Sequence, residues 1–220
     1  MIVVSGLRRS GTSMTMLALK EAGLDIIGEK FSGDNIEGNP NGYWEIPRIC
    51  KDEGLREEID GDAIKIMFEA LSFSKPELID KAILIFREPR KMLYSQFKDN
   101  QIDYPNIFIC KQAVDMVDSI AWLKYYKIPF KIVLYEDILQ SPGKEFKRLF
   151  KFIDKGDYKK AKSVVDKKLN RSKDYEGESI YIDTLENIYN KLNEIDTVMS
   201  WSPQIMKEAK DLMDNFDKTR

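Results

Sequence analysis

The sequence predicts a three-layer α/β fold, in which helices flank a central parallel sheet of four to five strands and further helices follow at the C-terminal end. Short apolar runs rich in Ile, Val, Leu or Phe occur at 1–5, 63–68, 82–86 and 130–135, each bounded by turn residues. Such runs are typical of buried parallel strands, and helical patterns between them predict crossover connections. The chain has 220 residues, 43% of them hydrophobic, which suffices for one core.

Helical periods lie between and after these strands. Their apolar positions are Met14, Leu17 and Ala18 in the first; Ala113, Val117, Ile120 and Ala121 in the second, which ends near Tyr126; and Phe146, Leu149, Phe150 and Ile153 in the third. Ser141-Pro142 starts the third helix, because Pro suits the first helical position. We expect its apolar face to pack on the sheet.

Beyond about residue 175 the pattern is only helical. We therefore assign 1–175 to the α/β domain and 176–220 to a helical extension packed on it. Two apolar stripes predict a helical hairpin that covers the sheet or contacts another chain: Leu185, Ile188, Tyr189, Leu192 and Ile195, then Ile205, Ala209, Leu212, Met213 and Phe216. The segment 28–43 is a loop by composition, and loops of that length are usually functional or mobile.

A glycine-bracketed loop follows the first strand. Residues 4–13 read Val-Ser-Gly-Leu-Arg-Arg-Ser-Gly-Thr-Ser, and Gly6 and Gly11 are placed so that backbone N–H groups can enclose phosphate oxygens at a helix N-terminus. A P-loop has lysine after its second glycine, whereas here Thr12 follows and the cations Arg8 and Arg9 lie inside the loop. The fold is thus P-loop-like, and its anion should be presented differently from the β and γ phosphates of a nucleoside triphosphate.

A second anion site is predicted at the end of the strand 82–86. Arg87 follows that strand, and Ser95 comes eight residues later on a helix expected to begin near Pro89. Both side chains can converge on one anion. Alternatively, Arg87 pairs with Glu88 or Asp99, and Ser95 faces solvent.

Together, the two sites resemble those of the sulfotransferase family, whose members bind 3′-phosphoadenosine 5′-phosphosulfate (PAPS) through two phosphate motifs. The matching blocks are scattered over residues 1–153: Arg8-Arg9-Ser10-Gly11-Thr12-Ser13, then Arg87 with Ser95, and Tyr135-Glu136-Asp137-Ile138 followed by Ser141-Pro142. The resemblance implies an enzyme that moves a sulfuryl group from PAPS to a hydroxyl or amine of a small-molecule or glycan acceptor, without a metal.

The resemblance also assigns roles to residues. Arg9 stands where many members have a catalytic Lys, Arg87 and Ser95 bind the 3′-phosphate, and Tyr135 lies near the adenosine. Arg171 is the late basic residue that closes on the 3′-phosphate, unless it is simply solvated. The 5′-phosphosulfate is held by Arg8, Arg9, Ser10, Gly11, Thr12 and Ser13.

The general base is not evident, because the chain contains no histidine and the base must be Glu, Asp, Lys or Tyr. Where cytosolic members have Lys-Thr-His, this chain has Lys65-Ile66-Met67, so Lys65 is retained and the base is not. The resemblance offers Glu29, about 20 residues past the loop arginine, and Glu45, in a segment similar to Asn-Pro-x-Gly-Tyr-Phe-Glu. Either can equally be a surface residue or a helix cap.

Two rival functions remain open. A P-loop kinase or NTPase needs a lysine after Gly11 and a strand-end Asp for Mg²⁺, and Thr12 does not meet the first requirement. A catalytically degenerate nucleotide-binding module would keep the fold without a base.

Charge and composition limit the partners. The net charge of −2 argues against a general nucleic-acid binder. Residues 143–173 nevertheless carry twelve Lys or Arg against four Asp or Glu. This basic segment is either a solvated face or a surface that attracts a polyanion.

Cys50 and Cys110 have no metal-ligand spacing and are interpreted as buried thiols. With no expected signal peptide and no apolar stretch long enough for a bilayer, we expect a cytoplasmic protein without membrane contact.

Overall fold

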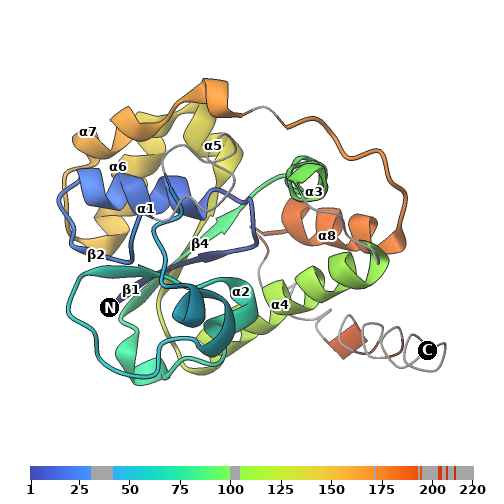
Figure 1. Ribbon diagram of the computed structural model, residues 1–220, viewed down its shortest axis with the longest axis horizontal. Coiled ribbons are helices and arrows are strands. Elements are labelled where there is room, and N and C mark those ends of the chain that lie inside the picture. Colours follow the sequence, from blue (N-terminus) through green and yellow to red (C-terminus); the bar gives the residue numbers. More distant parts are fainter. Residues whose placement is uncertain are drawn as a thin grey trace.

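The computed structural model describes residues 1–30, 42–99, 105–170, 172–192, 194, 203, 204, 207 and 211. Its centre is a five-stranded parallel sheet in the order β2-β3-β1-β4-β5; Figure 1 labels β1, β2 and β4. The strands are β1 (Ile2–Gly6), β2 (Ile26–Ile27), β3 (Ala63–Lys65), β4 (Lys81–Phe86) and β5 (Phe130–Leu134). The predicted α/β fold with a parallel sheet is therefore confirmed.

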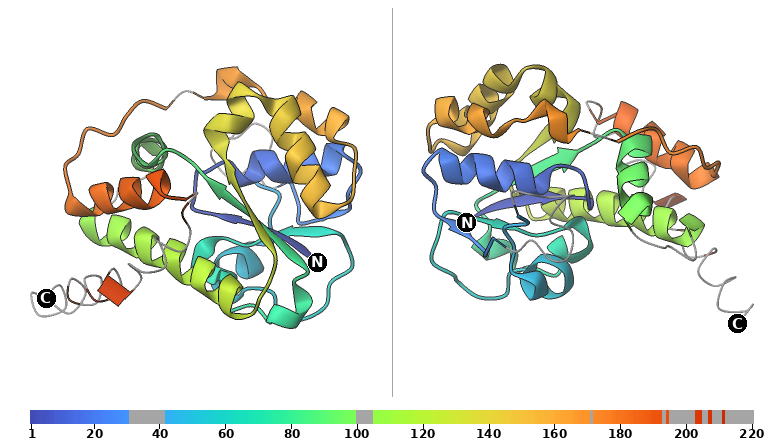
Figure 2. Two further views of the ribbon diagram at one scale, coloured as in Figure 1. Left: turned by 180° about the vertical axis from the view of Figure 1, so that it is seen from behind. Right: turned by 45° about the horizontal axis from the view of Figure 1, so that its top comes forward.

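Helices cover both faces of the sheet, as the two views of Figure 2 show. One face packs on α1 (Thr12–Glu21) and α6 (Pro142–Ile153), near α5 (Tyr135–Gln140) and α7 (Tyr158–Ala161). The other packs on α2 (Phe68–Leu71) and α4 (Pro105–Tyr125). Short helical turns complete this part of the chain: η1 (Ile49–Glu53), η2 (Pro76–Leu78), η3 (Lys162–Val164) and η4 (Lys167–Leu169).

Alternating strand residues build the two cores, because successive side chains of a strand point to opposite faces. In β1, Val4 belongs to the cluster with α1 and α6, whereas Val3 belongs to the cluster with α2 and α4. Phe146 and Leu149 of α6 are buried in the first cluster, which confirms the predicted packing of this helix on the sheet.

Two predicted strands are too long, and one strand was missed. The run 63–68 contains β3 only as far as Lys65, because Phe68 already begins α2. The predicted strand 130–135 is one residue too long, because β5 ends at Leu134 and Tyr135 is the first residue of α5. Strand β2 has only two residues, too few for a periodic pattern.

The C-terminal helix α8 (Ile180–Asn190) contacts α3 (Pro89–Asp99) and α4. Its buried residues include Leu185 and Ile188, as the first predicted apolar stripe requires. All five residues of the second stripe lie outside the described residues, as does most of the predicted loop 28–43.

The order of the strands indicates where a ligand would bind. From β1 the chain builds β2 and β3 on one side and then crosses to β4 and β5 on the other. In open α/β sheets, ligands bind at the carboxyl ends of the strands, where the order reverses. The loop after β1 lies at that point. None of the helices within the described ranges is long and apolar enough to cross a membrane.

Candidate functional site

The loop between β1 and α1 is held in its shape by two glycines. At Gly6, an added Cβ would lie 2.6 Å from the carbonyl oxygen of Ile85 on the neighbouring strand. Gly11 has φ +105°, and a Cβ there would lie 2.5 Å from the Tyr135 ring. Both positions therefore require glycine. Arg9 also has positive φ, at 69°, so the loop turns sharply at both ends of the Arg9–Gly11 segment.

The loop ends at the N-terminus of α1, where Thr12 is the first helical residue and no side chain in the described part of the chain caps the backbone. The first N–H groups of a helix have no intrahelical partner and favour an anion. Beside them, the Ser10 Oγ is fully buried and has no hydrogen-bond partner among the described residues. A buried hydroxyl without a partner is costly, so this end of the helix is prepared for a polar ligand.

The two predicted anion sites meet in the structure. The Arg9 Nε donates to the Ser95 Oγ over 2.8 Å, and the Arg87 Nη1 donates to the Arg9 carbonyl oxygen over 3.0 Å. Arg87 lies at the carboxyl end of β4 and Ser95 lies on α3. The first loop, β4 and α3 thus converge on one cationic cluster: Arg9, Arg87 and Ser95.

Arg87 is a buried cation, and no carboxylate of the described residues pairs with its guanidinium. Its side chain is 8% exposed, and its Nε has no partner among the described residues. Burial lowers the pKa of Arg87, Tyr135 and Glu136 oppose that change, and the charge of Arg9 adds to the lowering. The Arg9 and Arg87 guanidinium groups repel each other, and the Arg87 Nε has no partner among the described residues. This cluster therefore favours the binding of anionic groups.

The alternative pairing of Arg87 with Glu88 does not occur. Glu88 instead accepts from the backbone N–H groups of Arg90 and Lys91, over 3.0 and 2.9 Å. It thereby caps α3. The Arg87 Nη2 donates to the Asn170 Oδ1 over 2.8 Å. Ser95 is also buried and does not face solvent.

Tyr135 lies between the loop and Arg87. Its ring centroid is 4.7 Å from the Arg87 Cζ, a cation–π distance. Burial raises the pKa of Tyr135, while Arg87 opposes the change. The ring therefore orients the Arg87 guanidinium and also sets the limit on side-chain size at Gly11.

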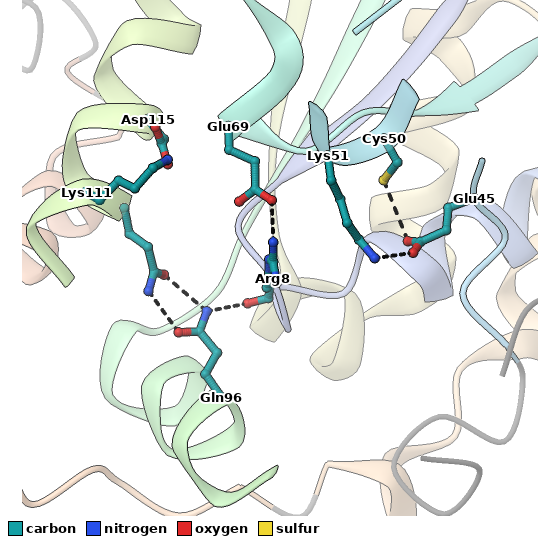
Figure 3. Close-up of polar contacts among 9 residues, drawn as sticks. Arg8, Glu45, Cys50, Lys51, Glu69, Gln96, Lys111 and Asp115 are labelled. Atoms are coloured by element: carbon teal, nitrogen blue, oxygen red, sulfur yellow. Dashed lines mark hydrogen bonds and ion pairs between the residues drawn. The ribbon is translucent and has the colours of Figure 1, made fainter. Parts of the chain in front are cut away.

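Arg8 lies on the outer side of the loop and is partly exposed. Its Nη2 donates to the Glu69 Oε1 over 2.6 Å, a contact drawn in Figure 3. The Arg8 carbonyl oxygen accepts from the Gln96 Nε2 over 2.7 Å. Gln96 and Gln112 exchange two buried hydrogen bonds of 3.1 and 2.9 Å. This amide pair fixes the loop backbone from α3 and α4.

Lys65, at the end of β3, adds a further cation to those already described at the loop. Its Nζ donates to the Ser13 Oγ over 3.3 Å and to the Tyr43 carbonyl oxygen. The same Nζ lies 2.7 Å from the Glu45 Oε2, and the side chain is 2% exposed. Lys65 therefore brings positive charge to the start of α1, although Thr12 occupies the usual lysine position of a P-loop.

Glu45 is held as a carboxylate in a buried cluster with Lys65, Lys51 and Cys50, most of which is drawn in Figure 3. Lys51 Nζ lies 2.6 Å from its Oε1, and the Cys50 thiol donates to its Oε2 over 3.6 Å. Burial acts to raise the pKa of Glu45, but the two lysines prevail and lower it. Burial raises the pKa of Cys50 to about 12, so the thiol stays protonated.

The structure places the two predicted base candidates side by side. Glu29 and Glu45 form an antiparallel backbone bridge. The Glu29 side chain is exposed, whereas both oxygens of Glu45 bind lysines. Neither geometry leaves a carboxylate oxygen that is both sheltered and available to a proton donor.

Three residues of the site were not identified from the sequence: Asn170, Glu69 and Lys51. Asn170 bonds to Arg87, and its predicted neighbour Arg171 lies outside the described residues. Glu69 and Lys51 were also missed, and both lie within a few residues of Lys65 or Glu45. The position of Glu69 four residues after Lys65 is the one sequence signal that could have drawn attention to it.

Comparison with protein-family models found no family that matches this chain, and comparison with curated proteins found no matching relative. The function is therefore inferred from the geometry of the site.

Proposed function

We propose that this protein is a sulfotransferase that moves the sulfuryl group of PAPS to a hydroxyl or amine acceptor. The observation that carries the proposal is the convergence of Arg9, Arg87 and Ser95 beside the uncapped N-terminus of α1. A ligand with phosphate groups at both ends of a nucleoside suits two cationic positions of this kind.

In this proposal the loop binds the phosphosulfate end. The backbone N–H groups from Gly11 to Ser13 and the Ser10 hydroxyl hold its oxygens, and Lys65 adds charge through its position at Ser13. Arg9 neutralises the 5′-phosphate oxygen that leaves. The 3′-phosphate is bound by Ser95 and by Arg87, whose Nε has no partner among the described residues.

Sulfuryl transfer needs alignment and charge neutralisation more than covalent help, as phosphoryl transfer does. The attacking acceptor oxygen, the sulfur and the leaving oxygen must be in line. Donors that are fixed before the substrate binds stabilise the developing charge most effectively. The bonds of the loop backbone to Gln96 and Arg87 provide that fixation.

Titration calorimetry with 3′-phosphoadenosine 5′-phosphate and with ATP plus Mg²⁺ tests the ligand. We expect the bisphosphate to bind and the Arg87→Ala variant to bind about 10- to 100-fold more weakly, as expected for loss of a charge-assisted contact. Arg56→Ala is the matched control, because Arg56 is exposed and bonds to the Glu53 carbonyl oxygen. Binding of ATP alone, with dependence on magnesium, would indicate a kinase or NTPase instead.

Transfer of labelled sulfate from PAPS to a panel of phenols, alcohols, amines and sugars tests the reaction. Arg9→Ala should lower kcat about 10²- to 10³-fold, because one preorganised donor to the leaving group is lost. Unchanged turnover would refute the role of Arg9. A protein that binds the bisphosphate but has no turnover would be a degenerate nucleotide-binding module.

A further inference from the structure

We infer that Glu69 is the general base that takes the proton of the acceptor. The inference rests on the proposed sulfotransferase function and names a residue for the step that the function leaves open. The Glu69 Oε1 accepts from the Arg8 Nη2 over 2.6 Å. This contact places a carboxylate against the loop beside Arg8 (Figure 3).

Glu69 is sheltered and still accessible. Its side chain is 21% exposed, whereas that of Glu45 is 4% exposed and bound by two lysines. Within the described part of the chain, Arg8 engages Glu69 through Oε1 alone, so Oε2 can accept a proton. A base must retain a free lone pair, and Glu69 retains one on Oε2.

The backbone that carries Glu69 is fixed. The preceding carbonyl oxygen, that of Phe68, accepts from the buried Ser119 Oγ of α4 over 3.0 Å, and Phe68 itself packs against Phe86 with ring centroids 5.5 Å apart. Because α2 follows directly after β3, Glu69 stands at the same edge of the sheet as Lys65. A base on a rigid element keeps its distance from the reacting atoms.

The charged groups around Glu69 lie on the loop and on α4. Arg8 of the loop binds it directly. On α4, Asp115 pairs with Lys111 over 2.6 Å, and burial raises the pKa of Asp115, with Glu69 and Asp118 adding to the change. Burial acts to lower the pKa of Arg8, but the carboxylates of Glu69 and Glu45 raise it. One guanidinium has five N–H donors and can bind a carboxylate and a sulfonate together, which would bring Oε2 next to the acceptor at the sulfur.

The chemical step is balanced without a further reactant. The lone pair of the acceptor oxygen or nitrogen forms the bond to sulfur, and the bond from sulfur to the bridging oxygen breaks. That electron pair stays on the 5′-phosphate of the departing 3′-phosphoadenosine 5′-phosphate. The acceptor proton moves to the Glu69 carboxylate, which then releases it to solvent.

The Glu69→Gln variant tests the inference, with Glu77→Gln as the matched control on an exposed turn. We measure bisphosphate binding by calorimetry, and sulfate release from labelled PAPS to water, to an acceptor panel and to 4-nitrophenol. Glu69→Gln should lower kcat about 10²- to 10⁴-fold, the usual contribution of a general base. Bisphosphate binding should be no weaker, because Arg8 loses a competing anion.

Two further readouts separate a base from a structural residue. With 4-nitrophenol at a pH where it is already ionised, the loss in Glu69→Gln should be much smaller, because no proton needs removal. Formate should partly restore turnover in Glu69→Ala by acting as an external base.

The outcomes separate the role of Glu69 from the proposed sulfotransferase function. Wild-type turnover that persists in Glu69→Gln overturns the inference, as does an equal loss with ionised 4-nitrophenol and with alcohols. A wild-type protein that binds the bisphosphate but releases no sulfate to any acceptor or to water also overturns it. Failure of the wild type to bind the bisphosphate refutes the proposed function itself.

Discussion

At the scale of single residues, the site depends on a buried ion pair. Glu45 and Lys65 are both almost completely buried, with 2.7 Å between Oε2 and Nζ, and Lys65 continues to Ser13 in the loop. Removing one partner of such a pair leaves an uncompensated charge in the interior. Glu45 therefore stabilises the fold and positions Lys65 at the anion site.

Glu45→Gln should lower the free energy of unfolding at pH 7 by about 3–5 kcal/mol. The lowered pKa of Glu45 means that its contribution is present above the pKa of an unfolded Glu, about 4.3. The contribution disappears as pH falls through the folded pKa. Urea unfolding from pH 7 to pH 3 should thus show a steeper acid loss in the wild type than in the variant. Equal slopes would contradict the assignment, and the exposed Glu77→Gln serves as control.

Gly11→Ala should weaken both stability and binding of the bisphosphate. The residue has φ +105°, and the new Cβ would overlap the Tyr135 ring, at a backbone cost of about 1–2 kcal/mol before the clash. Gly143 in α6 has open space around it, so Gly143→Ala should be neutral or stabilising by roughly 0.5 kcal/mol. Thermal unfolding and calorimetry measure both variants. Equal behaviour of the two variants would contradict the tight approach of Tyr135 to the loop.

At the scale of elements, α8 is attached to the site through α3. The Arg90 Nε donates to Glu186 over 2.7 Å, and its Nη1 donates to the carbonyl oxygens of Tyr175 and Gly177. One turn further along α8, the Tyr189 hydroxyl donates to the Glu136 Oε2 over 2.9 Å. Burial raises the pKa of Tyr189, so this hydroxyl remains a donor at neutral pH.

Arg90→Ala should loosen residues 175–190 without unfolding the sheet. The variant loses three hydrogen bonds to that segment, and regions with fewer anchoring contacts open more often. Hydrogen exchange measured by mass spectrometry should show faster exchange there and unchanged exchange in β1 and β4. Lys91→Ala, the next residue on α3, is the control. Faster exchange throughout the chain would show that α8 is part of the global folding unit.

Long elements could be predicted from the sequence, and short ones could not. Helix α6 has a regular apolar face and a proline at its start, so local pattern and packing agree. Strand β2 and the helical turn Ile49–Glu53 have too few residues for any period. The end of β3 was misplaced because Ile66, Met67 and Phe68 stay buried after the strand ends, and burial alone does not separate a strand from the start of a helix.

At the scale of the whole molecule, the fold brings residues together that the sequence separates. Arg9 and Ser95 are 86 residues apart and bond directly. The spacing of Ser95 from Arg87 predicted that these two residues share an anion, whereas the direct bond between Arg9 and Ser95 was not predicted. The contact between Arg8 and Glu69 spans 61 residues and had no such motif. It depends on the side-by-side arrangement of β1 and β3, which the sequence does not specify.

A ligand that binds the folded site should stabilise the whole molecule. At a concentration 100 times its Kd, 3′-phosphoadenosine 5′-phosphate adds about 2.7 kcal/mol, which corresponds to a rise in Tm of roughly 5–10 °C for a domain of this size. Differential scanning fluorimetry measures the shift, with adenosine as the control without phosphates. The Arg87→Ala variant should show a smaller shift at the same concentration. An equal shift in the variant would exclude Arg87 from the site.

A crystal structure with 3′-phosphoadenosine 5′-phosphate shows whether one nucleotide occupies both cationic positions. We predict electron density for a single nucleotide that bridges them, with its 5′-phosphate at the Arg9 loop and its 3′-phosphate at Arg87 and Ser95. A nucleotide bound elsewhere, or one whose 3′-phosphate makes no contact with Arg87, would contradict it.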